Sequence, residues 1–161
     1  MSVPRRYNRK EIKKTERTQL LVEQLLDVWE RSVRETHTFL PADDIAKIQP
    51  YVPQALQSVA HLVIEVDEKE HPVAFLGVED HHLEMLFLAP EVRGKGLGKR
   101  LVAFAIERYG IRTVTVNEEN PQARGFYEHM GFVVVGRSDI DKQGNPYPIL
   151  RMELQDLGES E

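Results

Sequence analysis

The sequence predicts one α/β domain built around a mixed sheet, and three observations support this fold class. The chain has 161 residues, the size of a single domain with a sizeable core. Short β-branched runs such as "HLVIEV" and "FVVV" alternate with longer stretches whose apolar residues recur at helical spacing. Neither an internal repeat nor a linker composition divides the sequence. One folded unit is therefore expected.

The first third of the chain is predicted to hold a strand and two helical stretches. Weak alternation predicts a first strand near Glu11 to Arg17. Thr18 can cap a helix that runs to about Glu35, and "ETHTFLPADD" then follows as a loop. A second helical stretch begins at Pro41 and is interrupted by two further prolines.

The middle of the chain predicts a hairpin, a further strand and a helix. His61 to Val66 and Pro72 to Val78 pair across the turn "DEKEH", and His82 to Leu88 is the next strand. A glycine-rich turn follows this strand. Beyond the turn, one face of a helix is traced by Leu97, Leu101, Val102, Ala105, Ile106 and Tyr109.

The last third alternates strands with one helix. Thr113 to Val116 predicts a short strand. Asn120 and Pro121 match the N-cap and first residue of a helix that Gly131 ends. "FVVV" predicts a strand, "DKQGNPYP" a loop, and Ile149 to Leu154 the final strand.

The composition indicates a soluble globular protein and excludes several kinds of chemical site. Contents of 41% apolar and 29% charged residues are ordinary for a soluble globular protein, and no apolar run is long enough to span a membrane. Because the amino terminus has no signal-peptide core, a cytoplasmic location is expected. The absence of cysteine excludes disulfides, thiolate metal ligands and a cysteine nucleophile. A net charge of −5 argues against nucleic acid as a partner.

Positive charge is concentrated at the amino terminus. Residues 1–17 contain only two acidic residues, both glutamates. The basic residues in the same segment are Arg5, Arg6, Arg9, Lys10, Lys13, Lys14 and Arg17. Two interpretations stay open: a solvated arm that leads into an exposed strand, or an arm that docks on an acidic partner. We expect a basic arm over 1–10, one domain over 11–155 and a tail over 156–161.

The glycine-rich turn lies within "LFLAPEVRGKGLGKRLVAF", Leu86 to Phe104. A P-loop would need Ser or Thr after Gly98 and Lys99, where this chain has Arg100. A dinucleotide fingerprint needs G-x-G-x-x-G after the first strand, and here the spacing is G-x-G-x-G past the middle of the chain. What remains is a nest of backbone amides at a helix N-terminus beside basic side chains, which suits a pyrophosphate. The alternative is a tight turn whose lysines only add solubility.

Two motifs together carry a family resemblance. The turn reads R-x-x-G-x-G at Arg93, Gly96 and Gly98, and Asn120 precedes "ARGFYEHMGF" in the pattern N-x-x-A-x-x-F-Y-x-x-x-G-F. Both motifs closely resemble the GCN5-related N-acetyltransferase (GNAT) family, the first resembling its acetyl-CoA pyrophosphate motif. Element order resembles the family over nearly the whole chain. "WERSVRETHTFL" and "GRSDIDKQGNPYPIL" resemble a bacterial branch described as acetylating protein lysines.

The resemblance implies a GNAT-like fold and an acetyl-CoA-dependent N-acetyltransferase. The fold would have a mostly antiparallel mixed sheet, about four flanking helices, and strands that splay at the cofactor cleft. A primary amine, with a protein lysine as one candidate, would attack the thioester directly in a ternary complex. The lack of cysteine agrees, because no acyl-cysteine intermediate can form. The alternatives are a non-catalytic CoA-binding module of the same fold and a phosphate-binding protein of another fold.

The resemblance also assigns cofactor contacts. The pantetheine arm would pair with the backbone of Leu86, Phe87 and Leu88, where a freed amide would polarise the thioester carbonyl. Asn120 would contact the cofactor, or would serve only as a helix cap. The pyrophosphate would lie on the segment made of Arg93, Gly94, Lys95, Gly96, Leu97, Gly98 and Lys99.

Catalytic candidates follow from the same motifs. Tyr127 matches the family's general acid, which protonates the departing CoA thiolate; the alternative is a packing role beside Phe126. Many members have a glutamate at the start of the strand before the glycine turn, where this chain has His82, which can titrate near neutral pH. Glu84, two residues on and expected on the same strand face, is the substitute base, and a bound water is a third candidate.

The acceptor site is less constrained by the sequence. The resemblance places it in the segments "THTFL" and "NPYP", which makes His37, Phe39 and Tyr147 the candidates; the alternative for each is a loop anchor. No metal is expected, because the six histidines include no HExxH motif. A homodimer is left open.

Overall fold

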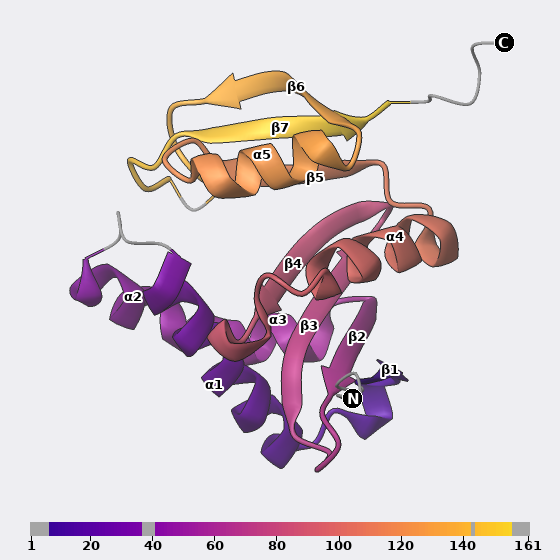
Figure 1. Cartoon of the computed structure of the whole chain (residues 1–161). Helices are drawn as coiled ribbons and strands as arrows, with labels where there is room; N and C mark the ends of the chain where they lie inside the picture. The colour runs from indigo at the N-terminus through magenta and orange to yellow at the C-terminus, as the bar shows by residue number, and fades with distance from the viewer. Residues whose placement is uncertain (1–6, 37–40, 143, 156–161) are drawn as a thin grey trace, which may run out of the picture.

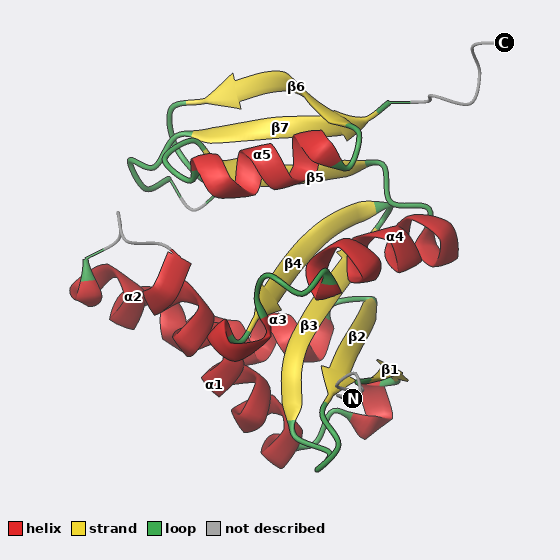
Figure 2. Ribbon diagram, viewed as in Figure 1, coloured by secondary structure: helices red, strands yellow, loops and turns green. Residues whose placement is uncertain are grey.

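The computed structural model describes residues 7–36, 41–142 and 144–155. These residues form a seven-stranded sheet with helices on both faces (Figures 1 and 2). The strand order is β1-β2-β3-β4-β5-β7-β6, in which β4 and β5 are parallel and every other neighbouring pair is antiparallel. The predicted mixed, mostly antiparallel sheet is confirmed.

The elements follow the chain in the predicted order. The strands are β1 Asn8–Ile12, β2 His61–Val66, β3 Pro72–Glu79, β4 His82–Leu88, β5 Thr113–Asn117, β6 Phe132–Ser138 and β7 Ile149–Leu154. The helices are α1 Gln19–Thr36, α2 Ala42–Ile48, α3 Val52–Ser58, α4 Leu97–Tyr109 and α5 Pro121–His129. If α2 and α3 are taken as one stretch interrupted at its prolines, the helical stretches number about four, as expected.

The predicted first strand was wrong in its position. β1 begins at Asn8 and ends at Ile12, and a short 3-10 turn, Lys14–Glu16, replaces the expected end of the strand. Arg17 is buried instead of exposed, with its guanidinium donating to the carbonyls of Leu56 and Val59 at 3.1 and 2.6 Å, at the end of α3. A buried guanidinium is tolerated because these carbonyls satisfy its donors.

Both predicted helix caps are present. The Thr18 hydroxyl accepts a hydrogen bond from the amide of Leu21 at 3.2 Å at the start of α1. The Asn120 side-chain oxygen accepts one from the amide of Ala123 at 3.2 Å at the start of α5. These bonds satisfy amides that have no partner within the helix.

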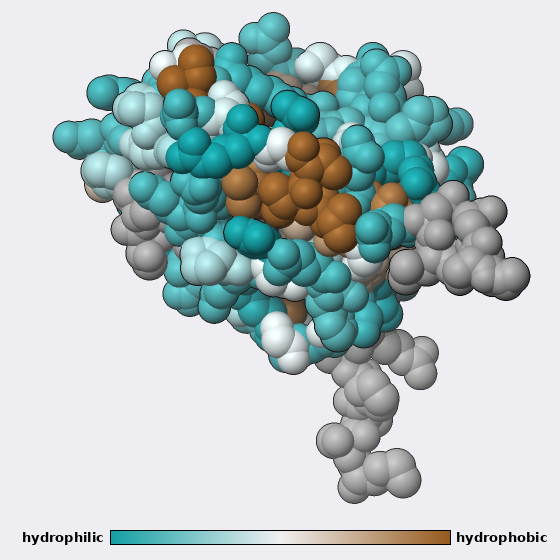
Figure 3. Space-filling model, turned by 90° about the horizontal axis from the view of Figure 1, so that it is seen from above, coloured by the Kyte–Doolittle hydropathy of each residue, from teal (hydrophilic) through white to brown (hydrophobic). Residues whose placement is uncertain are grey.

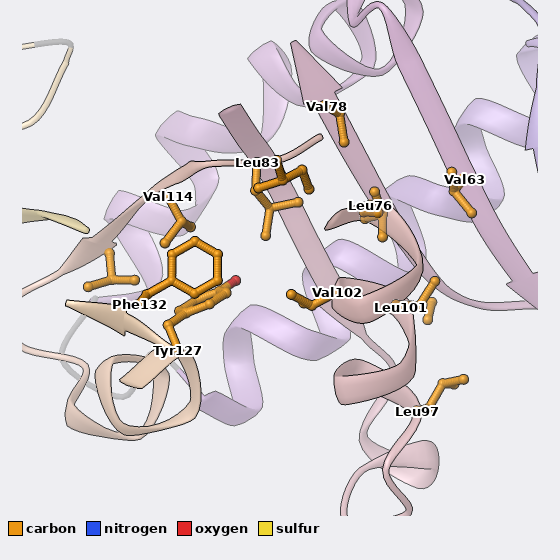
Figure 4. Packing of buried hydrophobic residues seen from close by; sticks show 14 of the residues in the cluster. Val63, Leu76, Val78, Leu83, Leu97, Leu101, Val102, Val114, Tyr127 and Phe132 are labelled. Carbon is orange, nitrogen blue, oxygen red and sulfur yellow. The ribbon is translucent and has the colours of Figure 1, made fainter. Parts of the chain in front are cut away.

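Two hydrophobic cores lie on opposite faces of the sheet. Leu76, Leu83 and Phe132 belong to the core under α4 and α5, part of which Figure 4 shows. Leu25, Leu56 and Phe75 belong to the core under α1 and α3. β4 contributes side chains to both cores, so it is the strand around which the two faces of the domain are organised.

Candidate active site

The sheet opens between β4 and β5. Only His82 and Leu83 of β4 pair with β5, opposite Thr113 and Val114, and the two strands then diverge (Figure 1). From Glu84 to Leu88, the edge of β4 that faces β5 therefore has no ladder partner. The predicted splayed strands are confirmed, and they leave a strand edge available for a ligand.

A β-bulge marks the point where β4 leaves β5. Leu83 lies opposite Val78 of β3 and Met85 lies opposite Gly77, so Glu84 is an extra residue without a counterpart. The bulge changes the side-chain alternation: Leu83 packs in the core under α4 and α5, whereas Met85 packs against the core under α1 and α3. The expectation that His82 and Glu84 share a face by simple alternation therefore does not describe this strand.

A cleft of about 490 Å³ occupies the opening. Its lining includes Leu86, Phe87 and Leu88 of the unpaired edge, and most of the predicted pyrophosphate segment. The residues of that segment that line the cleft are Arg93, Gly94, Gly96, Leu97, Gly98 and Lys99. Both predicted cofactor segments thus meet in one cleft.

The glycine turn has the geometry of an anion nest at a helix start. Gly94 and Gly96 have φ of +74° and +79°, a conformation that glycine adopts without strain, and Gly96 is the N-cap of α4. α4 begins at Leu97, so its first amides and the positive end of its dipole lie at the cleft. This arrangement suits a negatively charged group.

Tyr127 and Asn120 line the same cleft from α5 and its cap. The ring of Tyr127 packs edge-on against Phe126 and Phe132, with centroids 5.0 and 5.7 Å apart. Figure 4 shows its hydroxyl pointing from α5 across toward Leu83 and α4. Burial raises the pKa of Tyr127 above its ordinary value, so this phenol keeps its proton at neutral pH. Such a group can donate a hydrogen bond into the cleft.

The two base candidates occupy different surroundings. Glu84 lines the cleft, whereas His82 is half-buried beside it, with Nδ1 2.6 Å from the hydroxyl of Thr113. Burial lowers the pKa of His82, the nearby Glu84 carboxylate opposes that shift, and Lys142 adds to it. Lys142, from the loop between β6 and β7, lies 3.9 Å from Glu84. His82 is thus favoured in its neutral form.

The acceptor candidates are only partly described. His37 and Phe39 lie outside the described residues. Tyr147 is half-buried, and its hydroxyl donates a hydrogen bond to the carboxylate of Asp44 in α2. This contact joins the loop between β6 and β7 to the second helical stretch, two segments far apart in the sequence.

Several cleft residues were missed by sequence reasoning. Ser32 lies on the buried face of α1, and an Arg93 nitrogen donates to its hydroxyl at 3.4 Å. Asn117 ends β5, and His129 lies in the last turn of α5; both line the cleft. The sequence held two signals for these cleft residues: a polar residue within the apolar face of α1, and another at the end of a strand.

Neither a metal-binding cluster nor a membrane-spanning helix is found in residues 7–36, 41–142 and 144–155. Among those residues, no group of three or more His, Asp or Glu side chains is arranged to hold a metal ion. None of the helices that the structure describes is both long and apolar enough to cross a membrane.

Comparisons with known proteins agree with this geometry. A family model described as an acetyltransferase (GNAT) domain matches residues 24–155. The chain is 42% identical over 130 residues to the peptidyl-lysine N-acetyltransferase YjaB of Salmonella typhimurium, an alignment that covers 81% of this chain and 89% of that protein.

Solved structures give the same relationship. The solution structure of apo YjaB from Escherichia coli matches with a TM-score of 0.78 and 37% identity, covering 91% of this chain and 96% of the other. A putative streptothricin acetyltransferase from Bacillus anthracis, solved with acetyl coenzyme A, matches over 60% of this chain and 62% of its own. Its TM-score of 0.51 and identity of 20% show likeness of fold alone.

Proposed function

The chain belongs to the GNAT family of acetyl-CoA-dependent N-acetyltransferases, and from that premise we propose that its acceptor is the ε-amine of a protein lysine. The similarity to proteins named peptidyl-lysine N-acetyltransferases supports this acceptor. The observation that carries the proposal is the single cleft in which the unpaired edge of β4, the glycine nest and Tyr127 meet. An open cleft also suits a side chain presented by a second protein.

In this proposal, acetyl-CoA spans the cleft from the glycine turn to the bulge in β4. Backbone amides from Gly94 to Lys99 hold the pyrophosphate, and Arg93 and the side chain of Lys95 add positive charge. The pantetheine arm pairs with the free edge at Leu86 to Leu88. The side chain of Asn120 contacts the arm as well as capping α5, since one amide group can both accept and donate.

Tyr127 acts in the departure of CoA. A thiol has a pKa near 8.5, and the buried phenol has a pKa above its usual value near 10, so complete proton transfer to the thiolate is uphill. We therefore assign Tyr127 the donation of a hydrogen bond that strengthens as negative charge develops on sulfur. Such a contact stabilises the transition state more than the bound substrate.

The base removes a proton from the incoming ammonium. Glu84 lines the cleft and is the direct candidate, whereas neutral His82 lies beside it and can act through Glu84 or a water. Direct attack by the neutral amine on the thioester then needs no covalent intermediate on the protein. The chemistry proposed here requires no metal ion.

A module of the same fold that binds CoA without turnover is the competing function. The two are separated by measuring thiol release from acetyl-CoA across a panel of lysine peptides, polyamines and amino-terminal peptides. We expect release with lysine peptides and slower release with free lysine. If acetyl-CoA binds by calorimetry and no amine accelerates thiol release, the chain is a binding module.

We also propose a cytoplasmic homodimer. Val133 and Val135 of the edge strand β6 are 36% and 46% exposed, and Figure 3 shows an apolar patch on this side of the molecule. Packing of this face of β6 against the same face of a second copy would cover these valines. Sedimentation velocity at tens of micromolar protein should give a dimer that Val135→Glu weakens; a monomer would remove this part of the proposal.

A further inference from the structure

The loop between β6 and β7 brings a lysine of this chain to the cleft. The Lys142 ammonium lies 3.9 Å from the Glu84 carboxylate, and its side chain is 60% exposed. Glu84 is the bulge residue of β4 and lines the cleft. Within the described residues, the other ion pair of a lysine joins Lys10 to Glu70, and neither of these lines the cleft. Lys142 is therefore an amine already placed beside a candidate base.

The loop that carries Lys142 is held in place by several bonds. The Asp141 carboxylate accepts a hydrogen bond from the amide of Asn145 at 2.9 Å. Tyr147 donates to Asp44 of α2, and the amide after β5, at Glu118, donates to the carbonyl of Pro148 at 2.9 Å. These contacts fasten the loop to α2 and to the end of β5, so the approach of Lys142 to Glu84 is part of the fold.

We propose that Lys142 is a self-acetylation site, modified by the cleft of its own chain. This inference rests on the proposed function, since it uses the same cleft and the same acetyl-CoA. Glu84 accepts a proton from the Lys142 ammonium, and the neutral amine forms a bond to the thioester carbonyl carbon. The bond from that carbon to sulfur breaks, the nitrogen loses its second proton as the amide forms, and the departing CoA thiolate takes up that proton to become the thiol. The product is an amide at Nζ, which carries no charge.

Self-acetylation changes the cleft. The neutral amide ends the ion pair with Glu84, so the carboxylate becomes available to an external ammonium. Unmodified Lys142 competes with the acceptor for that carboxylate, and the modified chain does not. The first turnover therefore prepares the cleft for later ones.

The test is to incubate the full-length protein with acetyl-CoA alone and map acetylated lysines by peptide mass spectrometry. Lys69, exposed in the turn between β2 and β3, reports uncatalysed acetylation in the same sample. Because a tethered amine has a high effective concentration, Lys142 should react at least about tenfold faster than Lys69. Its rate constant should not change when the protein is diluted a hundredfold. Lys142→Arg should remove the fast site, and Lys69→Arg should leave it.

A mixing experiment separates reaction within one chain from reaction between chains. The chain with its original sequence is mixed with a Gly96→Val variant of different mass, in which the glycine nest is disrupted. Neither protein is acetylated at the start. Acetylation at Lys142 should be confined to the chain with an intact nest. Equal rates at Lys142 and Lys69, or a Lys142 rate that scales with protein concentration, would overturn the inference.

A lysine peptide in a parallel reaction keeps the two proposals distinguishable. Thiol release with the peptide, while Lys142 stays unmodified, overturns self-acetylation and leaves the proposed function intact. Failure of transfer to both the peptide and Lys142 overturns both. Acetylation of Lys142 without any peptide reaction supports the inference and restricts the enzyme to its own chain.

Discussion

The two edges of β4 face very different neighbours. Along the edge toward β3, pairing runs from Glu79 opposite His82 to Ala74 opposite Leu88. Along the edge toward β5, pairing stops after Leu83, and a cleft takes its place. One strand is thus fully paired on one side and borders an open cleft on the other.

We expect the stability of the domain to depend on the paired side of β4, and its activity on the open side. On the paired side, Phe75 and Leu76 of β3 are completely buried. On the open side, Leu86 and Leu88 stay partly exposed, and Phe126 of α5 is only half-buried. Substitutions on the paired side are expected to change the free energy of unfolding, and substitutions on the open side are expected to change binding and rate.

Replacing a buried aromatic on the paired side should have the largest effect. We expect Phe75→Ala to lower the free energy of unfolding by about 4 kcal/mol, through lost burial and the cavity left behind. Phe126→Ala, on the open side, should cost about 1 kcal/mol, since less surface is buried. Urea denaturation measures both, and equal losses would mean that the two sides do not differ as proposed.

Removal of the Tyr127 hydroxyl should have the second-largest effect, this time on the rate of catalysis. Tyr127→Phe keeps the packing against Phe126 and Phe132, and should lower kcat about a hundredfold, or about 3 kcal/mol of barrier. Acetyl-CoA affinity should change little, because the contact strengthens only as sulfur departs. Tyr109→Phe, at the end of α4 and outside the cleft, is the matched control for a lost phenol. A parental kcat in Tyr127→Phe would make this residue a packing aromatic.

A side chain in the glycine nest should weaken cofactor binding. Gly96→Val forces a β-branched residue to positive φ and places its Cβ 3.2 Å from an Arg100 nitrogen, so acetyl-CoA affinity should fall by at least about tenfold. Gly144→Val carries the same backbone strain, at φ +83°, away from the nest. Titration calorimetry with acetyl-CoA on both variants separates the effect of backbone strain from the effect of a side chain in the nest. Similar affinities would remove the nest assignment.

The smallest effect is expected from pH. Burial lowers the pKa of His82, so kcat/KM should rise with pH through an ionisation below about 6.5, and His82→Ala should remove it. Because the unfolded chain binds this proton more tightly than the folded one, stability should fall as pH drops through the same range, and less so in His82→Ala. His71→Ala, in the turn between β2 and β3, is the control. An unchanged rate profile would leave Glu84 or water as the base.

The local sequence was enough to predict the helices, most of the strands and the motifs of the candidate cofactor site. Apolar periodicity located α1 and α4, and Thr18 and Asn120 were recognised as caps because a cap needs only its own helix amides. The glycine turn was recognised because glycine is the residue that adopts positive φ without strain, as Gly94 and Gly96 do. The family, and with it the N-acetyltransferase activity, was apparent from the two motifs and the element order.

Tertiary structure decided what depends on contacts between distant segments. Arg17 is buried because carbonyls at the end of α3 surround it, a fact absent from its own neighbourhood in the sequence. The bulge at Glu84 is a property of the β3–β4 register, and β5 leaves β4 after Leu83 while it stays paired with β7 on its other side. The placement of Lys142 beside Glu84 has the same origin. Periodicity acts over a few residues, whereas register and strand separation are set by packing across the whole sheet.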